Sequence, residues 1–311
     1  MRNGILIVDY VGDFIGDYEI ASWDKYFDIK PLNFLSLPKN RINEYIDEKG
    51  IKFIIVSVYN KFDYTVLKDF PIPVILALGD APRRIKNDEV KDIVVNNRFW
   101  GMSLHSYAAV ECIRDYLYPY EVEIFPYTWG LDFSIFDDYH LEKDVDVGST
   151  GKYSNYQMRR ELDIALSANQ NIKFVRQRNK AFNREEHVKY AQFLNRNLIS
   201  IGGCMQEKVL SHYKGKLISD NFPKNFEIPA VNTCLLTTEW GDREILGFKD
   251  EENCIIVKSP REAIRKVLYY LDDKEQLTKV SRNGYDLIHK NFDINVTTKK
   301  LVDSIEKKIN G

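Results

Sequence analysis

The residues best suited to chemistry lie between Lys224 and Thr238. A short helix carrying Glu227 is expected to lead through a turn into a buried strand that starts at Cys234. A carboxylate in such a place is the usual acceptor for the two ribose hydroxyls of a bound nucleotide. Lys224, in the first turn of the same helix, could neutralise phosphate charge or be a surface lysine. We therefore predict a nucleotide site here, with a solvated helix carboxylate as the alternative interpretation of Glu227.

A second candidate for phosphate binding is the turn Gly148-Ser149-Thr-Gly-Lys152, between an expected strand and an expected helix. Glycines let a phosphate approach the backbone, and a helix N-terminus supplies N–H donors and partial positive charge. The spacing is not that of a Walker loop, and an ordinary turn is the competing interpretation. Lys216 could also neutralise phosphate or lie on the surface, and Thr237 and Thr238 could bond a ligand where their strand ends.

One carboxylate in the first half of the chain could act as a catalytic base. Asp80 follows an apolar strand, Pro73 to Leu78, at the end where ligands bind in parallel sheets. It could deprotonate an acceptor or contact a sugar, or it could cap the next helix. His105 falls in a helical pattern and is interpreted as a core or surface histidine.

These residues must be positioned by alternating strands and helices, a rhythm that predicts βαβ units and mostly parallel sheets. The polar segment 137–144 is the expected linker between two such series. Ser259, Pro260 and Glu262 form a capping box that opens a long helix. The predicted strands are 4–10, 52–58, 73–78, 92–95, 122–126, 145–147, 172–175, 198–201 and 254–257, and the predicted helices are 40–48, 103–117, 156–167, 184–194, 259–272, 274–290 and 296–309.

Composition narrows the class of protein. A chain of 311 residues can form two domains with their own cores, and a net charge of −2 gives no argument for nucleic acid or membrane as the main partner. The four cysteines form no CxxC pair and the five histidines show no metal-ligand spacing, so no metal is expected. No signal peptide or membrane span is indicated, and we expect a cytoplasmic protein. Richness in Lys, Asn, Ile and Tyr suggests an AT-rich bacterial or phage genome.

The string Lys224-Asn-Phe-Glu-Ile-Pro-Ala230, followed by a Leu-Leu-Thr strand, resembles the donor-binding half of GT-B glycosyltransferases. It is most similar to the bacterial family that includes the spore-maturation protein CgeB. Two further segments resemble that family, Asp144-Val-Asp-Val-Gly-Ser149 and Leu131-Asp-Phe-Ser-Ile-Phe136. Asn232 stands where the family usually has Gly, and Lys224 where Arg is commoner.

The resemblance implies a GT-B fold of two Rossmann-like domains facing a cleft. Residues 1–138 would form the acceptor-side domain, residues 139–294 the donor domain, and residues 295–311 a helix that packs back on the first domain. It also implies that Arg159 or Arg160 meets the donor diphosphate and that one of the pair faces solvent. The glycine-bearing loop of the acceptor side would contain Gly12, Asp13 and Gly16.

The implied activity is transfer of a sugar from a nucleotide-diphosphate sugar, with a UDP-sugar favoured, to an unknown acceptor: a glycan, a protein or a modified nucleic acid base. The resemblance further implies retention of anomeric configuration and no need for a metal, since basic side chains would stabilise the leaving diphosphate. Two alternatives remain, a catalytically silent sugar-nucleotide or glycan-binding module and a nucleotide-sugar epimerase. Ser219 favours the silent module, because some retaining families carry a second glutamate eight positions before the ribose ligand.

Overall fold

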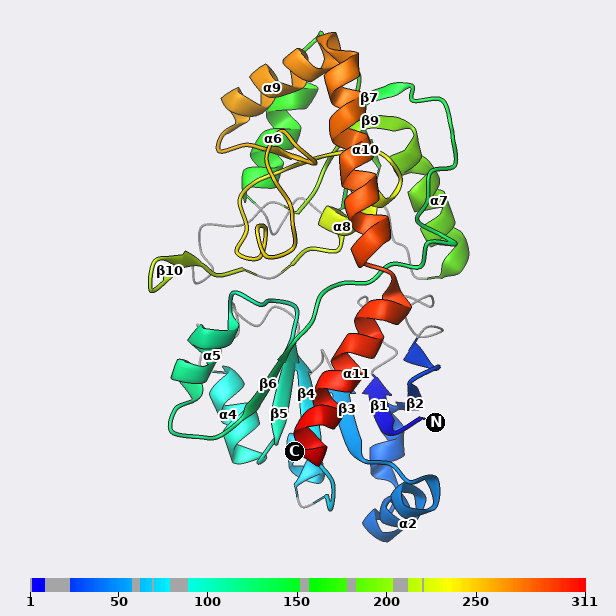
Figure 1. Ribbon diagram of the computed structural model, residues 1–311, viewed down its shortest axis with the longest axis vertical. Helices are drawn as coiled ribbons and strands as arrows, with labels where there is room; N and C mark the ends of the chain where they lie inside the picture. Colours follow the sequence, from blue (N-terminus) through cyan, green and yellow to red (C-terminus); the bar gives the residue numbers. More distant parts are fainter. Residues whose placement is uncertain are drawn as a thin grey trace.

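The chain forms two α/β lobes stacked end to end in the computed structural model (Figure 1). The first lobe is built on a six-stranded sheet and the second on a five-stranded sheet, and every strand pairing in both is parallel. The predicted βαβ organisation is therefore confirmed. The structure describes residues 2–8, 23–57, 62–68, 70–78, 89–151, 157–177, 183–203, 212–219 and 221–311.

The sheet of the first lobe has the order β2-β1-β3-β4-β5-β6 and packs on both faces. Side chains alternate across a strand, so Ile5 and Ile7 of β1 face one hydrophobic core while Leu6 and Val8 face another. The strands are β1 (Gly4–Val8), β2 (Phe27–Pro31), β3 (Phe53–Ser57), β4 (Val74–Leu78), β5 (Gly101–Leu104) and β6 (Glu123–Pro126). The helices of this part of the chain are η1 (Leu32–Ser36), α2 (Lys39–Lys49), η2 (Tyr64–Leu67), α4 (Glu89–Asn96) and α5 (Val110–Leu117).

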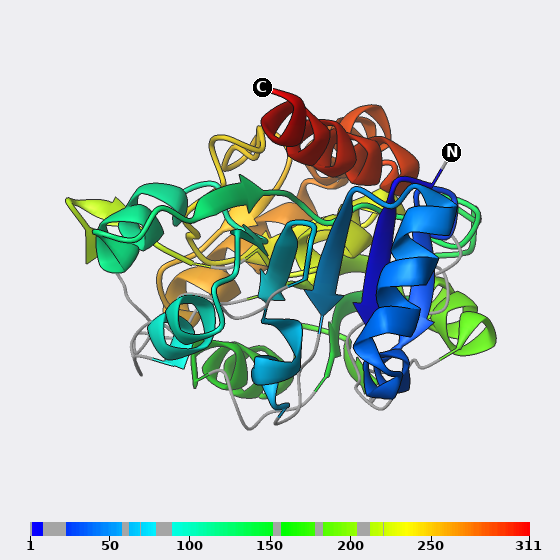
Figure 2. The same ribbon diagram turned by 90° about the horizontal axis from the view of Figure 1, so that it is seen from below.

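The second face of this sheet is covered by α11 (Ile294–Asn310), a helix from the far end of the chain. Its buried residues Leu301, Val302 and Ile305 pack in one cluster with Leu6 and Phe53. Figure 2 shows α11 lying across the strands of the first lobe. The prediction that the C-terminal helix crosses back is thus confirmed.

The second lobe has the sheet order β13-β12-β9-β7-β8. The helix that starts at Pro260 is capped as the sequence predicts. The Ser259 hydroxyl accepts from the Glu262 N–H at 3.2 Å, and the Glu262 carboxylate accepts from the Lys258 N–H at 2.8 Å. The elements are β7 (Val145–Thr150), α6 (Gln157–Ser167), β8 (Phe174–Gln177), α7 (Arg184–Asn195), β9 (Asn197–Ile201), the hairpin β10 (His212–Tyr213) and β11 (Lys216–Leu217), α8 (Lys224–Ala230), β12 (Cys234–Thr237), β13 (Ile255–Ile256), α9 (Pro260–Asp272) and α10 (Lys274–Asn291).

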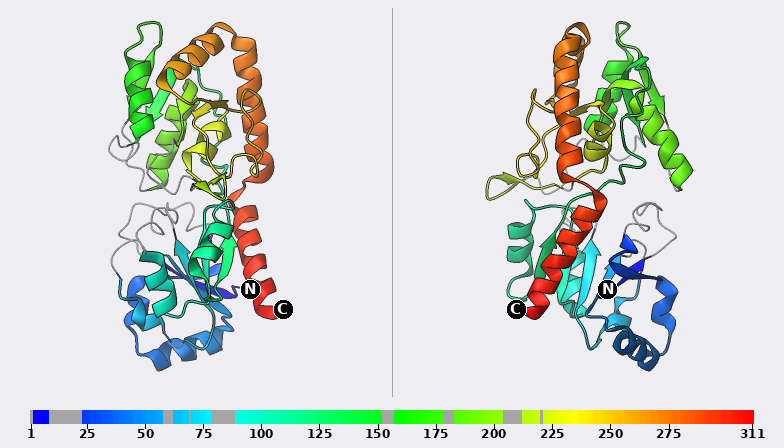
Figure 3. Two further views of the ribbon diagram at one scale, coloured as in Figure 1. Left: turned by 90° about the vertical axis from the view of Figure 1, so that its left-hand side faces the viewer. Right: turned by 45° about the vertical axis from the view of Figure 1, so that its right-hand side comes forward.

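The chain passes between the lobes in the segment 127–144 and again from α10 to α11, and these two passages lie side by side (Figure 3). The Leu131 N–H donates to the Phe292 carbonyl at 2.8 Å, and the Ile294 N–H donates to the Leu131 carbonyl at 3.0 Å. Gly130 is required at this crossing, because a Cβ there would come within 2.1 Å of the Thr297 hydroxyl and 2.5 Å of the Ile294 Cα.

Several predicted elements are wrong. Residues 92–95 are helical, as part of α4, because Val90 and Val94 at i and i+4 face the core together. The predicted helix 103–117 is instead the strand β5 followed by α5, and the edge strand β2 was not predicted. β7 continues to Thr150, so the turn after it begins later than predicted. No described helix is both long and apolar enough to cross a membrane.

Candidate functional site

The carboxyl edge of the second sheet faces the first lobe. The segment that leaves β12 contains Asp242, whose carboxylate accepts hydrogen bonds from the Tyr107 and Ala108 N–H groups of the loop after β5. The loops at the carboxyl ends of both sheets therefore meet, and such an edge is where parallel α/β sheets bind ligands.

A cluster of cations gathers at the end of β7. The Lys224 ammonium donates to the Thr150 hydroxyl at 2.8 Å, and the buried Arg159 guanidinium donates to the Thr150 carbonyl. Gly151 has a φ of 100°, which favours glycine, and a Cβ there would lie 3.5 Å from Arg159 and 3.6 Å from Lys224. The backbone turn after β7 thus passes directly beside both cations. Arg176 joins them by donating to the Gly151 carbonyl at 2.8 Å.

Two carboxylates, those of Asp163 and Glu227, accompany these three cations. Asp163 is buried, accepts from the Ser149 hydroxyl at 2.7 Å and lies 3.6 Å from Arg176. Burial raises the pKa of Asp163, although Ser149, Arg159 and Arg176 favour its charged form. Arg159, Arg176, Lys224, Asp163 and Glu227 are called the cationic cluster below, because its cations outnumber its carboxylates.

The ammonium of Lys224 is held in an unfavourable place for a charge. Burial and, to a smaller extent, the charge of Arg159 lower the pKa of Lys224 to about 8, and the opposing charge of Glu227 does not compensate for them. A bound anion would offset both effects. This part of the site therefore gains most from a ligand that brings negative charge.

Glu227 projects from the first turn of α8 and is 8% exposed. Its Oε2 accepts from the Tyr190 hydroxyl at 2.9 Å, and the same hydroxyl lies 3.4 Å from the Lys224 ammonium. Burial and the Glu227 charge raise the pKa of Tyr190, so this hydroxyl stays protonated as a donor. Among the described residues nothing donates to Oε1 of Glu227, which leaves one carboxylate oxygen for a ligand hydroxyl.

The remaining predicted site residues of this region differ from one another in exposure and in their contacts. Arg160 is exposed, whereas Arg159 is buried. Gly148 lies inside β7, where a Cβ would come within 2.0 Å of the Asn197 side chain, and the Ser149 hydroxyl is taken by Asp163. Thr237 donates to the Gly203 carbonyl at 2.7 Å, and its neighbour Thr238 is 9% exposed.

Some predicted residues cannot be placed. Gly12, Asp13, Gly16 and Asp80 lie outside the described residues. Lys216 lies in β11, but its side chain is also outside what the structure describes.

Two departures from the resembled family have structural explanations. Asn232 has a φ of 54°, a left-handed conformation that Asn tolerates better than most residues, so it can replace a glycine in this turn. Its side chain also donates to the Asp138 carboxylate at 2.8 Å. Ser219 is 1% exposed, and its hydroxyl accepts from the Gly241 N–H at 2.8 Å, so this position holds no carboxylate toward a ligand.

A second buried polar cluster joins the lobes. Asp242 is fully buried and accepts from the Tyr107 N–H at 2.7 Å, the Ala108 N–H at 2.6 Å, the Asn221 amide at 2.8 Å and the Ser106 hydroxyl at 3.3 Å. Burial raises the pKa of Asp242 against these bonds, and none of the described groups that bond it is a cation. Asp242 and its four partners are called the interlobe carboxylate cluster below.

His105 lies beside this cluster as a core histidine. Its ring stacks on Trp129 with centroids 3.8 Å apart, and its Nε2 lies 2.6 Å from the Tyr127 hydroxyl. Burial lowers the pKa of His105 to about 3, so the ring is neutral at physiological pH. It positions the loop after β5 rather than facing the cationic cluster.

Sequence reasoning did not find Thr150, Tyr190 or Arg176. Thr150 was within the predicted turn, but nothing marked its hydroxyl as a partner of Lys224. Tyr190 lies in the predicted helix 184–194, but nothing in the sequence marked its hydroxyl as a partner of Glu227. Among the described residues, no group of three or more His, Cys, Asp or Glu side chains is arranged to hold a metal ion.

The sequence of the second lobe is similar to a known family. Residues 157–303, slightly less than half of the chain, match the model of the family described as glycosyl transferase-like. No curated protein matches the sequence significantly.

Solved structures share the whole fold. Sucrose-phosphate synthase from Thermosynechococcus elongatus aligns with a TM-score of 0.65 at 11% identity, covering 100% of both chains. HepE from Anabaena, solved in complex with UDP, aligns with a TM-score of 0.64 at 10% identity, covering 99% of this chain and 100% of HepE. A glycosyltransferase from Rickettsia africae aligns with a TM-score of 0.63 at 13% identity, covering 99% of each chain.

The predicted fold class is thereby confirmed: the protein has the GT-B fold of two parallel-sheet α/β lobes with a returning C-terminal helix. The prediction of a glycosyltransferase is confirmed at the level of the fold and of the sequence family of residues 157–303.

Proposed function

We propose that the protein transfers a sugar from a nucleotide-diphosphate sugar, with a UDP-sugar as the favoured donor, and that it is a CgeB-like member of the GT-B class. The observation that carries this proposal is the cationic cluster at the carboxyl edge of the second sheet, with Glu227 beside it. HepE, a neighbour with the same fold, has been solved with UDP-glucose. The string from Lys224 to Ala230 supports the CgeB-like assignment.

The diphosphate and the ribose of such a donor match different parts of the cluster. Lys224 and Arg159 would hold the diphosphate, whose negative charge grows as the bond to the sugar breaks. Glu227 would accept from the ribose hydroxyls through the oxygen that Tyr190 leaves free. Residues 139–294 would thus form the donor domain and residues 1–138 the acceptor-side domain, with residues 295–311 returning to the latter.

Retention of configuration and independence of metal ions are part of the proposal. Charge stabilisation by Arg159 and Lys224 can take the place of a metal at the leaving diphosphate. Turnover should therefore be unchanged by a chelator such as EDTA. Asp80 remains our candidate for contact with the acceptor or the sugar, and the acceptor itself is to be sought among glycans, proteins and modified nucleic acid bases.

The first test is a thermal-shift screen against UDP-, GDP-, ADP-, CDP- and dTDP-sugars. A nucleotide-sugar that binds the folded protein should raise its melting temperature. This shift should be lost in Glu227→Ala, because the variant lacks the carboxylate that we assign to the ribose hydroxyls. Glu275→Ala is the matched control, since Glu275 is also a first-turn helix glutamate but is exposed. A shift that survives in Glu227→Ala would contradict the assigned ribose ligand.

A catalytically silent sugar-nucleotide-binding module is the second candidate. The observation that favours it is Ser219, whose hydroxyl is bonded within the fold where some retaining families place a glutamate. Product analysis separates the possibilities. Released or transferred sugar supports the transferase, an isomerised sugar nucleotide would identify an epimerase, and binding without turnover would identify the silent module.

A further inference from the structure

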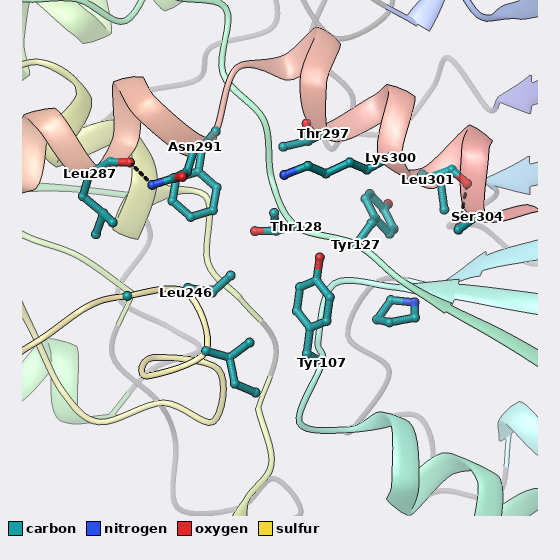
Figure 4. A pocket seen from close by; sticks show the side chains of 14 residues that line it. Tyr107, Tyr127, Thr128, Leu246, Leu287, Asn291, Thr297, Lys300, Leu301 and Ser304 are labelled. Carbon is teal, nitrogen blue, oxygen red and sulfur yellow. Dashed lines mark hydrogen bonds between the residues drawn. The ribbon is translucent and has the colours of Figure 1, made fainter.

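A separate pocket lies where the two lobes meet along α11 (Figure 4). Its volume is about 520 Å³, within the range of small-molecule sites. The lining comes from the loop after β5, the first passage between the lobes, the segment after β12, α10 and α11. Representative lining residues are Tyr107, Thr128, Leu246, Asn291 and Lys300, and none belongs to the cationic cluster.

Lys300 gives this pocket a positive charge. Its ammonium has no ion pair among the described residues, whereas the adjacent Lys299 donates to Asp303 at 2.8 Å. None of the described residues that line the pocket is an Asp or Glu. Figure 4 shows the Lys300 ammonium and the Tyr107 hydroxyl pointing into the same space. A ligand there would meet this cation without competition from a carboxylate of the described lining residues.

Thr128 provides a second, independent observation. It is 9% exposed, and its Oγ1 is buried with no hydrogen-bond partner among the residues that the structure describes. An unpaired buried hydroxyl destabilises the fold. In Figure 4 Thr128 lies between Lys300 and Tyr107, and its hydroxyl is on the side of Leu246 and Asn291. A ligand oxygen in the pocket would relieve the destabilisation.

The remaining wall is apolar, with Leu246 and Phe292 mostly buried and Leu287 beside them. A pocket with one cation, a few hydrogen-bonding groups and an apolar wall suits an organic molecule rather than a bare inorganic ion. Its volume also exceeds what a single phosphate group would fill.

We propose that this pocket binds a small organic anion with an apolar body, its charged group at Lys300 and Thr128 and its body against Leu246 and Leu287. Because the lining comes from both lobes, the bound molecule favours the relative position of the lobes seen here. This proposal does not depend on the proposed sugar transfer, because binding to the pocket can be measured without any turnover.

The test is calorimetric titration of the full chain with phenyl phosphate, which combines an anionic group with an apolar ring. Lys300→Met should weaken binding about tenfold, because a charge-assisted bond is lost. Thr128→Val, which keeps the shape, should weaken it about threefold. Lys299→Met is the matched control and should leave affinity unchanged. Inorganic phosphate and benzyl alcohol, which each carry half of the probe, should bind more weakly than phenyl phosphate.

Three results would overturn this site. They are absence of phenyl phosphate binding to the unmodified protein, equal losses in Lys299→Met and Lys300→Met, and loss of binding in Arg159→Met. The last would place the probe in the cationic cluster. Binding that persists at saturating UDP and weakens about tenfold in Lys300→Met supports the pocket, whether or not the protein transfers sugar.

Discussion

The cationic cluster and the interlobe carboxylate cluster are both buried and polar, but they are satisfied to different degrees. Asp242 receives four hydrogen bonds from within the fold. In the cationic cluster the Lys224 ammonium is disfavoured by burial and by Arg159, and one oxygen of Glu227 accepts nothing from the described residues. A saturated buried cluster contributes to stability and specificity of the fold, whereas a cluster with excess charge is prepared for a ligand.

The largest expected effect is on stability, from Asp242→Ala. The Tyr107 and Ala108 N–H groups would lose their buried acceptor, so the free energy of unfolding should fall by about 3 kcal/mol. Denaturant unfolding measures it. Asp303→Ala, which removes a carboxylate from an exposed ion pair, should change stability by less than about 0.5 kcal/mol. Equal changes in both variants would contradict a structural role for Asp242.

The next effect is on ligand affinity, from Arg159→Met. Loss of a buried guanidinium should weaken UDP binding about 30-fold, or roughly 2 kcal/mol, with a smaller loss of stability than in Asp242→Ala. Arg160→Met, one residue along α6 and exposed, is the control and should bind UDP normally. Titration calorimetry with both variants decides whether the buried arginine is the one that binds the diphosphate.

A smaller effect is the pH dependence of the same site. Because the pKa of Lys224 is about 8, UDP affinity should fall about tenfold between pH 7 and pH 9 as the ammonium loses its proton. Stability without ligand should change in the opposite sense. The unfolded chain binds more protons between the lowered pKa and the ordinary value of 10.5, so stability rises with pH there. Lys224→Arg should bind UDP with no such pH dependence, since arginine stays charged; a decline of the same size in that variant would exclude Lys224 as its source.

The smallest effect comes from Ser106→Ala. The Ser106 hydroxyl makes the longest of the four bonds to Asp242, at 3.3 Å, and the other three donors remain. It also accepts from the Ala109 N–H at 3.2 Å, so the substitution removes two bonds. The free energy of unfolding should fall by about 1 kcal/mol. A loss as large as that of Asp242→Ala would mean that the four bonds act as a unit rather than separately.

Alternation of apolar and amphipathic segments was enough to predict α/β lobes with parallel sheets, whereas the GT-B fold was predicted from the resemblance of the string Lys224 to Ala230. The alternation failed where local patterns are ambiguous. Residues 92–95 are rich in valine, which favours strands, but the i and i+4 spacing of Val90 and Val94 decides for a helix. β5 is short and is followed by polar residues, so its apolar run was absorbed into the predicted helix. A short apolar run does not by itself show whether its residues repeat with the period of a helix or of a strand.

Prediction of the site depended on how close its residues lie in the sequence. Lys224 and Glu227 share one helix and were predicted together. Tyr190, which bonds Glu227, lies on another helix, and Asp242 meets its partners across the lobes. No local pattern links positions that only the packing of sheets and helices brings together.

The cover of the first lobe by α11 has a consequence for biosynthesis. Leu6 and Phe53 emerge early from the ribosome, yet the residues that bury them, Leu301 and Ile305, are made almost at the end. Ile218, from the segment between β11 and α8, also belongs to the opposite core of that lobe. The first lobe therefore cannot complete its hydrophobic core before the rest of the chain has been synthesised. One face of its sheet stays exposed, or bound by a chaperone, until α11 has been made.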